Sequence, residues 1–201
     1  MIVAVETNFI LQLALQQEQA EQAERILKLA EDKKIEIAIP ACAFPEAYTK
    51  LVGLSKLRNK LLDDLRRELK QMARSKVHAS LEQTSKDITD ALATTGTQFA
   101  DDLDKIANRL RACATIIPLT SEVTKVMSYL ELLFDLEPGD AFIYASVESY
   151  LDTRKDEQKV FVTTDKDFEV TRVFLSGKGI DLAIGIGTGY GAITEKLNAK
   201  A

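Results

Sequence analysis

The chain contains few of the residues from which several common kinds of site are built. Its 201 residues include two cysteines and one histidine. Cys42 and Cys113 lie far apart in sequence and belong to no Cys-x-x-Cys or Cys/His pattern, which indicates buried free thiols rather than a metal or redox site. His78 has no second histidine and no base and nucleophile pair beside it, so a catalytic or ligand role for it is not expected.

The chain also lacks a long hydrophobic run. No apolar segment approaches the roughly 20 residues that a membrane span needs, and the first residues, 1–6, contain no basic segment of the kind that begins a secretion signal. We therefore expect a cytoplasmic protein that does not contact a membrane. A chain of this length can bury the core of one domain, and we expect a single domain over residues 1–201.

The chain also has no excess of positive charge, since its formal net charge is −5 at pH 7. This argues against a protein that coats nucleic acid indiscriminately. Residues 50–78 differ from the rest, since they hold nine basic and three acidic residues. Such a basic segment is expected where an acidic metal site must also hold a polyanion. A long helix with a solvated charged face explains the same pattern equally well.

Acidic residues follow directly after apolar strands. The run Ile2–Val5 predicts a central parallel strand that is buried on both faces, and Glu6 comes next. The run Val160–Val162 predicts another buried strand, and Asp165 and Asp167 lie just beyond it. Open α/β sheets keep their sites at the carboxyl ends of the strands. A carboxylate there is unfavourably desolvated unless a positive charge lies close to it.

Two further acidic residues are predicted to reach the same edge. Pro45 fits the first turn of a helix, and Glu46 in that turn can point back toward Glu6. Asp140 begins another helix, where exposed N–H groups stabilise a carboxylate without any metal, so helix capping is the simpler interpretation of this residue alone. If these three carboxylates converge with Asp165, a hard divalent cation such as Mg²⁺ or Mn²⁺ is their natural partner.

The remaining segments alternate between helices and short strands. Helical spacing of apolar residues predicts helices over residues 9–30 (as one helix or two), 54–76, 85–113 (with a weak point at 94–97), 120–134, 141–151 and 168–175. Apolar runs predict strands over residues 35–39, 115–119 and 180–184. Residues 54–113 are thus expected to form a helical hairpin between the second and third acidic positions.

A glycine-rich run over residues 185–191 resembles the loop of methyltransferases that use S-adenosylmethionine, and loosely a dinucleotide-binding loop. Such a loop needs a following strand that ends in an acidic ribose-binding residue. Only residues 192–201 remain, which is too short for that strand. We therefore expect a flexible loop that leads into a short terminal helix over residues 192–198.

Taken in order, these segments resemble the PIN-domain superfamily of metal-dependent ribonucleases. The resemblance lies in four motifs that each carry an acidic residue, namely Val5–Asn8, Pro45–Ala47, Gly139–Ser146 and Val162–Phe168. It covers residues 1 to about 53 and 115 to about 184. It implies an α/β fold, a three-layer α/β/α sandwich around a central, mostly parallel sheet of four or five strands, with a helical hairpin inserted at about residues 54–113.

The resemblance also implies an endoribonuclease that hydrolyses RNA phosphodiester bonds with Mg²⁺ or Mn²⁺. The catalytic metal ligands that it implies are Glu6, Glu46, Asp140 and Asp165. Thr7 and Asn8 would orient these ligands or a bound water, and Asp167 would support them or act as a fifth ligand. The chemistry agrees, because one or two divalent ions, roughly 3.5–4 Å apart when paired, activate water and stabilise both oxygens of the displacement.

Two departures from the family pattern bear on function. The first acidic residue is usually Asp, whereas Glu6 is one methylene longer, and Mg²⁺ tolerates little error in ligand geometry. The hairpin is longer than in the small toxin members and resembles that of larger, stand-alone members.

We hypothesise that this hairpin grips RNA phosphates through its basic residues, which are Lys56, Arg58, Lys60, Arg66, Arg67, Lys70 and Arg74. The alternative is a catalytically weak PIN-like module that binds RNA or a protein partner through the hairpin. Because family members often dimerise, the resemblance also leaves a homodimer open.

Overall fold

The computed structural model describes residues 1–75 and 81–199, and a parallel sheet lies at its centre. The strands are β1 (Ile2–Val5), β2 (Glu36–Pro40), β3 (Thr115–Ile117), β4 (Lys159–Thr163) and β5 (Ile180–Ile184). They form a five-stranded sheet in the order β3-β2-β1-β4-β5, in which all neighbouring strands are parallel. The predicted α/β fold with a central parallel sheet is therefore confirmed.

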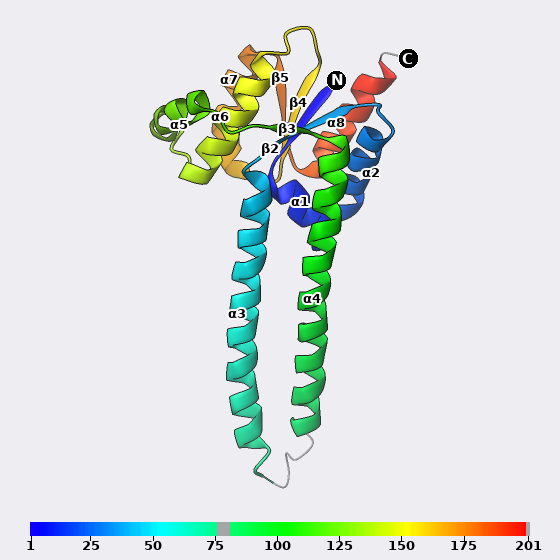
Figure 1. Cartoon of the computed structure of the whole chain (residues 1–201), viewed down its shortest axis with the longest axis vertical. Coiled ribbons are helices and arrows are strands. Elements are labelled where there is room, and N and C mark those ends of the chain that lie inside the picture. The colour runs from blue at the N-terminus through cyan, green and yellow to red at the C-terminus, as the bar shows by residue number, and fades with distance from the viewer. Residues whose placement is uncertain (76–80, 200–201) are drawn as a thin grey trace.

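Helices cover both faces of this sheet (Figure 1). They are α1 (Thr7–Ala14), α2 (Ala20–Glu31), α3 (Ala43–Met72), α4 (Leu81–Cys113), α5 (Ser121–Phe134), α6 (Pro138–Asp152), α7 (Arg172–Gly177) and α8 (Ile186–Asn198), with a 3-10 helix, η2, at Lys166–Thr171. Val3 and Val5 face the core formed with α1, α2 and α8, whereas Ile2 and Ala4 face the core formed with α5 and α6. Successive side chains of β1 thus pack alternately into two cores, and both faces of this strand are buried.

The helices α3 and α4 pack side by side and project from the sheet as a long hairpin (Figure 1). Within it Leu62 is buried, and the guanidinium of Arg58 lies 5.3 Å from the centre of the Phe99 ring. The helix that carries Glu46 continues into the hairpin without a break, because α3 begins at Ala43 rather than near residue 54. No helix in the described part of the chain is long and apolar enough to cross a membrane.

The interruption that the weak point at residues 94–97 predicts in the second hairpin helix is wrong, because α4 is continuous through these residues. The hydroxyl groups of Thr94, Thr95 and Thr97 each donate a hydrogen bond to a backbone carbonyl four residues earlier, so these side chains are accommodated within the helix. The turn of the hairpin, predicted over residues 75–84, is wrong at its end, because α4 already begins at Leu81; residues 76–80, with His78, lie outside the described residues.

Both ends of the chain differ in detail from the sequence prediction. Of the two alternatives for residues 9–30, two helices is the correct one, because Gln16 has a left-handed backbone with a φ of 51° between α1 and α2. The prediction of a loop over residues 185–191 is wrong, since α8 begins at Ile186. A Cβ atom on Gly189 would lie 2.6 Å from Val162 Cγ2, so glycine lets α8 pack directly on β4.

The first backbone N–H groups of α8 are capped by a side chain from elsewhere in the chain. The backbone N–H groups of Ile186 and Gly187 donate hydrogen bonds to Gln19 Oε1, at 2.6 and 3.2 Å. These are the groups that would bind a phosphate at a helix N-terminus. The glycine-rich run is therefore part of a packed and capped helix, in keeping with the rejection of a cofactor loop.

Candidate metal centre

Five acidic residues from four parts of the chain meet at the carboxyl edge of the sheet. Glu6 follows β1, Glu46 lies in the first turn of α3, and Asp140 lies in the first turn of α6. Asp165 and Asp167 follow β4. Parallel strands end at the same edge, which is why acids so distant in sequence become neighbours. Their negative charges act on one another: those of Asp165 and Glu46 contribute to the raised pKa of Asp140.

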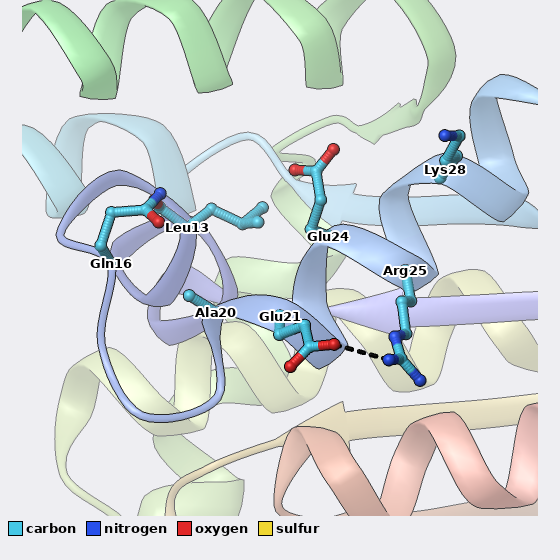
Figure 2. Close-up of a pocket in the computed structure, with 7 residues that line it drawn as sticks. All are labelled: Leu13, Gln16, Ala20, Glu21, Glu24, Arg25 and Lys28. Atoms are coloured by element: carbon cyan, nitrogen blue, oxygen red, sulfur yellow. Dashed lines mark hydrogen bonds and ion pairs between the residues drawn. The ribbon is translucent and has the colours of Figure 1, made fainter.

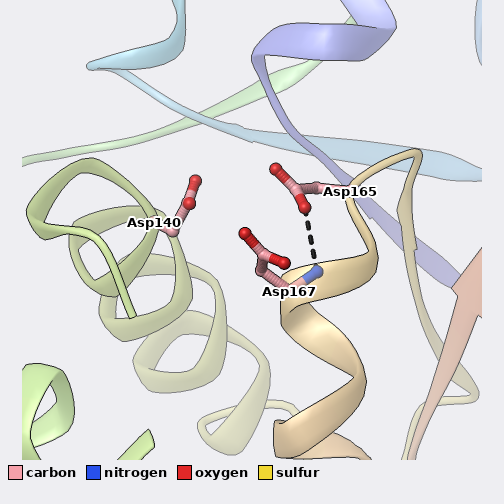
Figure 3. A group of neighbouring side chains, drawn as sticks. All are labelled: Asp140, Asp165 and Asp167. Carbon is pink, nitrogen blue, oxygen red and sulfur yellow. Dashed lines mark hydrogen bonds between the residues drawn. The ribbon is translucent and has the colours of Figure 1, made fainter. Parts of the chain in front are cut away.

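Three of these carboxylates converge. Asp140, Asp165 and Asp167 each present one oxygen, and these three oxygens all lie within 4.8 Å of one another (Figure 3). The backbone N–H of Asp167 donates a 2.9 Å hydrogen bond to Asp165 Oδ1, which fixes the first turn of η2 between them. Metal–oxygen distances of about 2.0–2.6 Å place the ligands of one ion at about this separation. The donor set therefore fits a hard divalent cation.

Asp140 lies inside the first turn of α6 and is not its capping residue, since the N-cap position belongs to Glu137. Burial raises the pKa of Asp140 to about 6, and the negative charges of Asp165 and Glu46 add to this effect. A carboxyl group in such surroundings is favoured in its ionised form when a cation binds beside it. The N-terminus of α6 still stabilises the carboxylate of Asp140, and a cation bound beside the three aspartates would in addition offset their mutual repulsion.

Glu6 is only 2% exposed and both of its oxygens accept hydrogen bonds. Oε2 accepts from the backbone N–H of Asn8 at 2.6 Å, so Glu6 caps α1, and Oε1 accepts from Thr163 Oγ1 at 3.1 Å. Burial raises the pKa of Glu6 to about 7 despite these hydrogen bonds. Asn8 thus contacts Glu6 through its backbone. Thr163, which also accepts from the N–H of Asp165, was missed by the sequence analysis.

Glu46 is held by two side chains. Thr7 Oγ1 donates a 2.5 Å hydrogen bond to Oε2, and Lys50 Nζ lies 2.8 Å from Oε1. Burial alone would lower the pKa of Lys50, but the hydrogen bond and charge of Glu46, together with the charges of Glu6 and Asp140, hold it above its ordinary value. Lys50 is a site residue that the sequence analysis missed, although the four-residue spacing from Glu46 is the usual spacing of a helical ion pair.

The predicted phosphate-binding residues of the hairpin divide into two groups. Arg58 packs over Phe99, and Arg66 donates a 3.2 Å hydrogen bond to Thr89 Oγ1, so both face α4. The other five are exposed and run along α3 and its end. We call these five the basic ladder: Lys56, Lys60, Arg67, Lys70 and Arg74. At a rise of 1.5 Å per residue, the basic ladder begins about 9 Å beyond Lys50 and ends about 36 Å beyond it.

A separate surface pocket of about 560 Å³ lies between α1 and α2 (Figure 2). Three of its four charged side chains form ion pairs, since Arg25 pairs with Glu21 at 2.5 Å and Glu24 pairs with Arg109 at 2.6 Å. None of the five clustered acidic residues lines it. This pocket is therefore not part of the carboxylate cluster.

Comparison with known proteins identifies a family for the chain. Residues 3–168 match the family model described as PIN domain. No curated protein matches the chain. Among solved structures, the crystal structure of VapBC2 from Rickettsia felis bound to a DNA fragment from their promoter is similar, with 15% sequence identity, a TM-score of 0.42, and coverage of 92% of this chain and 99% of that one. The solved structure adds nothing on function at this level of similarity.

Proposed function

Since the chain belongs to the PIN-domain family, a family of nucleases, we propose that it is a metal-dependent endoribonuclease that hydrolyses RNA phosphodiester bonds at the carboxylate cluster. The observation that carries this proposal is the convergence of Asp140, Asp165 and Asp167 to within 4.8 Å, beside Glu6 and Glu46. Among the described residues, this is the group with the spacing and the donor type of a metal site.

In this proposal Asp140, Asp165 and Asp167 hold Mg²⁺ or Mn²⁺. When bound, the ion supplies an activated water and stabilises the charge that develops on the phosphate. Glu6 and Glu46 close the side of the cluster next to β1 and add negative charge that favours the ion. Thr163 orients Glu6, and Thr7 orients Glu46, by the hydrogen bonds described above.

The basic ladder gives the proposed enzyme a surface for RNA. Its positive charges lie on the helix that carries Glu46, so an RNA strand held there is led toward the carboxylates. Binding of this kind is mostly to phosphate and weakens with salt. Arg58 and Arg66 act within the hairpin instead, by holding α3 against α4.

The second candidate function is a PIN-like module that binds RNA or a protein partner through the hairpin and cleaves weakly. One observation favours it: Glu6 already caps α1, and Glu46 is already paired with Lys50. Both residues are thus occupied by donors of the protein, although the family resemblance implies them as metal ligands, and of the clustered acidic residues only three aspartates remain to hold an ion. This candidate predicts RNA or protein binding that does not depend on a divalent ion.

Cleavage of a mixed RNA pool separates the two candidates. The chain is assayed with Mn²⁺ and with EDTA, and compared with Asp140→Asn and with Asp152→Asn, which makes the same change at an exposed position at the end of the same helix. The proposed function predicts Mn²⁺-dependent cleavage that Asp140→Asn abolishes and Asp152→Asn leaves intact. Absence of cleavage by the unaltered chain, or cleavage that Asp140→Asn does not reduce, contradicts it.

A further inference from the structure

The carboxylate cluster contains a positive charge of its own, and we propose that Lys50 takes the place of a second metal ion, so that the site binds a single divalent ion. The inference rests on the proposed function, because it assigns Lys50 a role toward the phosphate that is cleaved. It deepens that function by naming the number of ions and a further residue that contacts substrate.

The cluster has an open half and a closed half. In the open half, Asp140, Asp165 and Asp167 point their oxygens toward one another (Figure 3). In the closed half, all four carboxylate oxygens of Glu6 and Glu46 already accept a hydrogen bond from the protein. A second ion there would have to share these oxygens with their donors and would lie beside the ammonium group of Lys50, whereas a first ion in the open half meets neither condition.

Lys50 contacts the closed half, and its charge also acts on the open half. Its ammonium group is 2.8 Å from Glu46 Oε1, and it also feels the charges of Glu6 and Asp140. The helix sets this position, because Glu46 and Lys50 are one turn apart on the same face of α3. A positive charge therefore already acts on Asp140 of the open half, as a second cation does in paired-ion nucleases.

The ammonium group has the freedom and the donors to contact a phosphate. Lys50 has a side chain that is 46% exposed, so the group can reach substrate without leaving Glu46. An ammonium has three N–H donors, and with one directed to Glu46, two remain for non-bridging phosphate oxygens.

In the hydrolysis a water oxygen forms a bond to phosphorus, the bond from phosphorus to the leaving ribose oxygen breaks, and a water proton ends on that oxygen. Lys50 keeps its proton throughout and stabilises the added negative charge of the phosphate by hydrogen bonds. A simpler role, in which Lys50 only holds Glu46 in place, makes the opposite prediction for metal binding. Loss of the Lys50 side chain would then leave the Glu46 carboxylate disordered and would weaken metal binding.

Mn²⁺ titration of the full chain without RNA, followed by the electron paramagnetic resonance of free Mn²⁺, tests the inference. We expect one Mn²⁺ per chain for the unaltered protein and for Lys50→Arg. For Lys50→Met and Lys50→Gln we expect a second bound ion or at least tenfold tighter binding of the first, because a repelling charge is removed. Lys125→Met, on the exposed face of α5, should match the unaltered protein.

Two bound ions in the unaltered protein, or equal or weaker Mn²⁺ binding by both Lys50→Met and Lys50→Gln, overturn the inference. Cleavage supplies a second readout: Lys50→Met should cleave at least tenfold more slowly while it binds Mn²⁺ more tightly, and unchanged cleavage contradicts the role. The failures are distinguishable. If the unaltered chain binds no Mn²⁺, the proposed function fails. If it binds Mn²⁺ and the Lys50 variants bind it in the same way, only the role of Lys50 fails.

Discussion

The substitution Glu6→Gln should change how the stability of the metal-free protein depends on pH. Glu6 is 2% exposed, and its pKa rises from 4.5 to about 7 in the folded chain because of burial. A carboxyl group whose pKa is raised by folding holds a proton that the unfolded chain releases. Its contribution to stability is therefore complete below pH 4.5 and is lost as the pH rises through 7.

The magnitude follows from the pKa difference. At about 1.4 kcal/mol per pKa unit, the free energy of unfolding of the native sequence should fall by about 2 to 3 kcal/mol more than that of Glu6→Gln between pH 5 and pH 8. Glutamine does not ionise, and its single oxygen can accept one of the two hydrogen bonds that the carboxylate accepts. Any constant effect of the amide, such as an unpaired N–H, cancels when the two pH dependences are compared.

Urea unfolding of both proteins in EDTA, at pH 5 and at pH 8, measures this difference. Addition of Mn²⁺ at pH 8 should restore most of the lost stability to the native sequence, because the ion balances the buried charge. Equal losses of stability in the two proteins would refute the reasoning, since Glu6 would then ionise without cost in its buried position.

Three further predictions concern the metal, the fold and the RNA surface. The Mn²⁺ affinity should fall at least tenfold from pH 8 to pH 6, because Glu6 and Asp140, with pKa values of about 7 and 6, become protonated over this range and the cluster loses negative charge. A calorimetric titration at both pH values checks this. Gly189→Ala should destabilise the chain by about 1–3 kcal/mol, because its Cβ would meet β4. Gly191→Ala, which has open space, should be neutral or stabilise by up to about 1 kcal/mol in the same urea assay. Reversing the charges of the basic ladder should weaken RNA binding and flatten its salt dependence. An unchanged slope of log affinity against log salt concentration would show that the ladder does not bind RNA phosphates.

Much of the fold follows from the sequence because buried parallel strands leave a strong pattern. Ile2–Val5 and Val160–Val162 are continuous apolar runs, and both are neighbouring central strands of the sheet. The start of α8 could not be predicted in the same way, since a run of glycines usually marks a loop. Its helical state depends on packing: Gly189 fits against Val162, and Gln19, far away in sequence, caps the first turn.

The acidic residues of the site are visible in the sequence because each follows a strand or begins a helix. The sequence does not reveal how they are held. Thr163 contacts Glu6 only because the ends of β1 and β4 meet in space, and the four-residue spacing of Glu46 and Lys50 does not show that their ion pair lies near Glu6 and Asp140. For Asp140, capping and metal binding leave the same signal in sequence, and only the structure shows that Asp165 and Asp167 lie beside it.

The most direct test of the metal centre is a crystal grown with Mn²⁺ and examined by anomalous scattering at the manganese edge. We predict one peak about 2.0–2.6 Å from carboxylate oxygens of Asp140, Asp165 and Asp167, with the ammonium of Lys50 beside it. The absence of a peak among these three residues, in a crystal that holds Mn²⁺ elsewhere, would contradict the account.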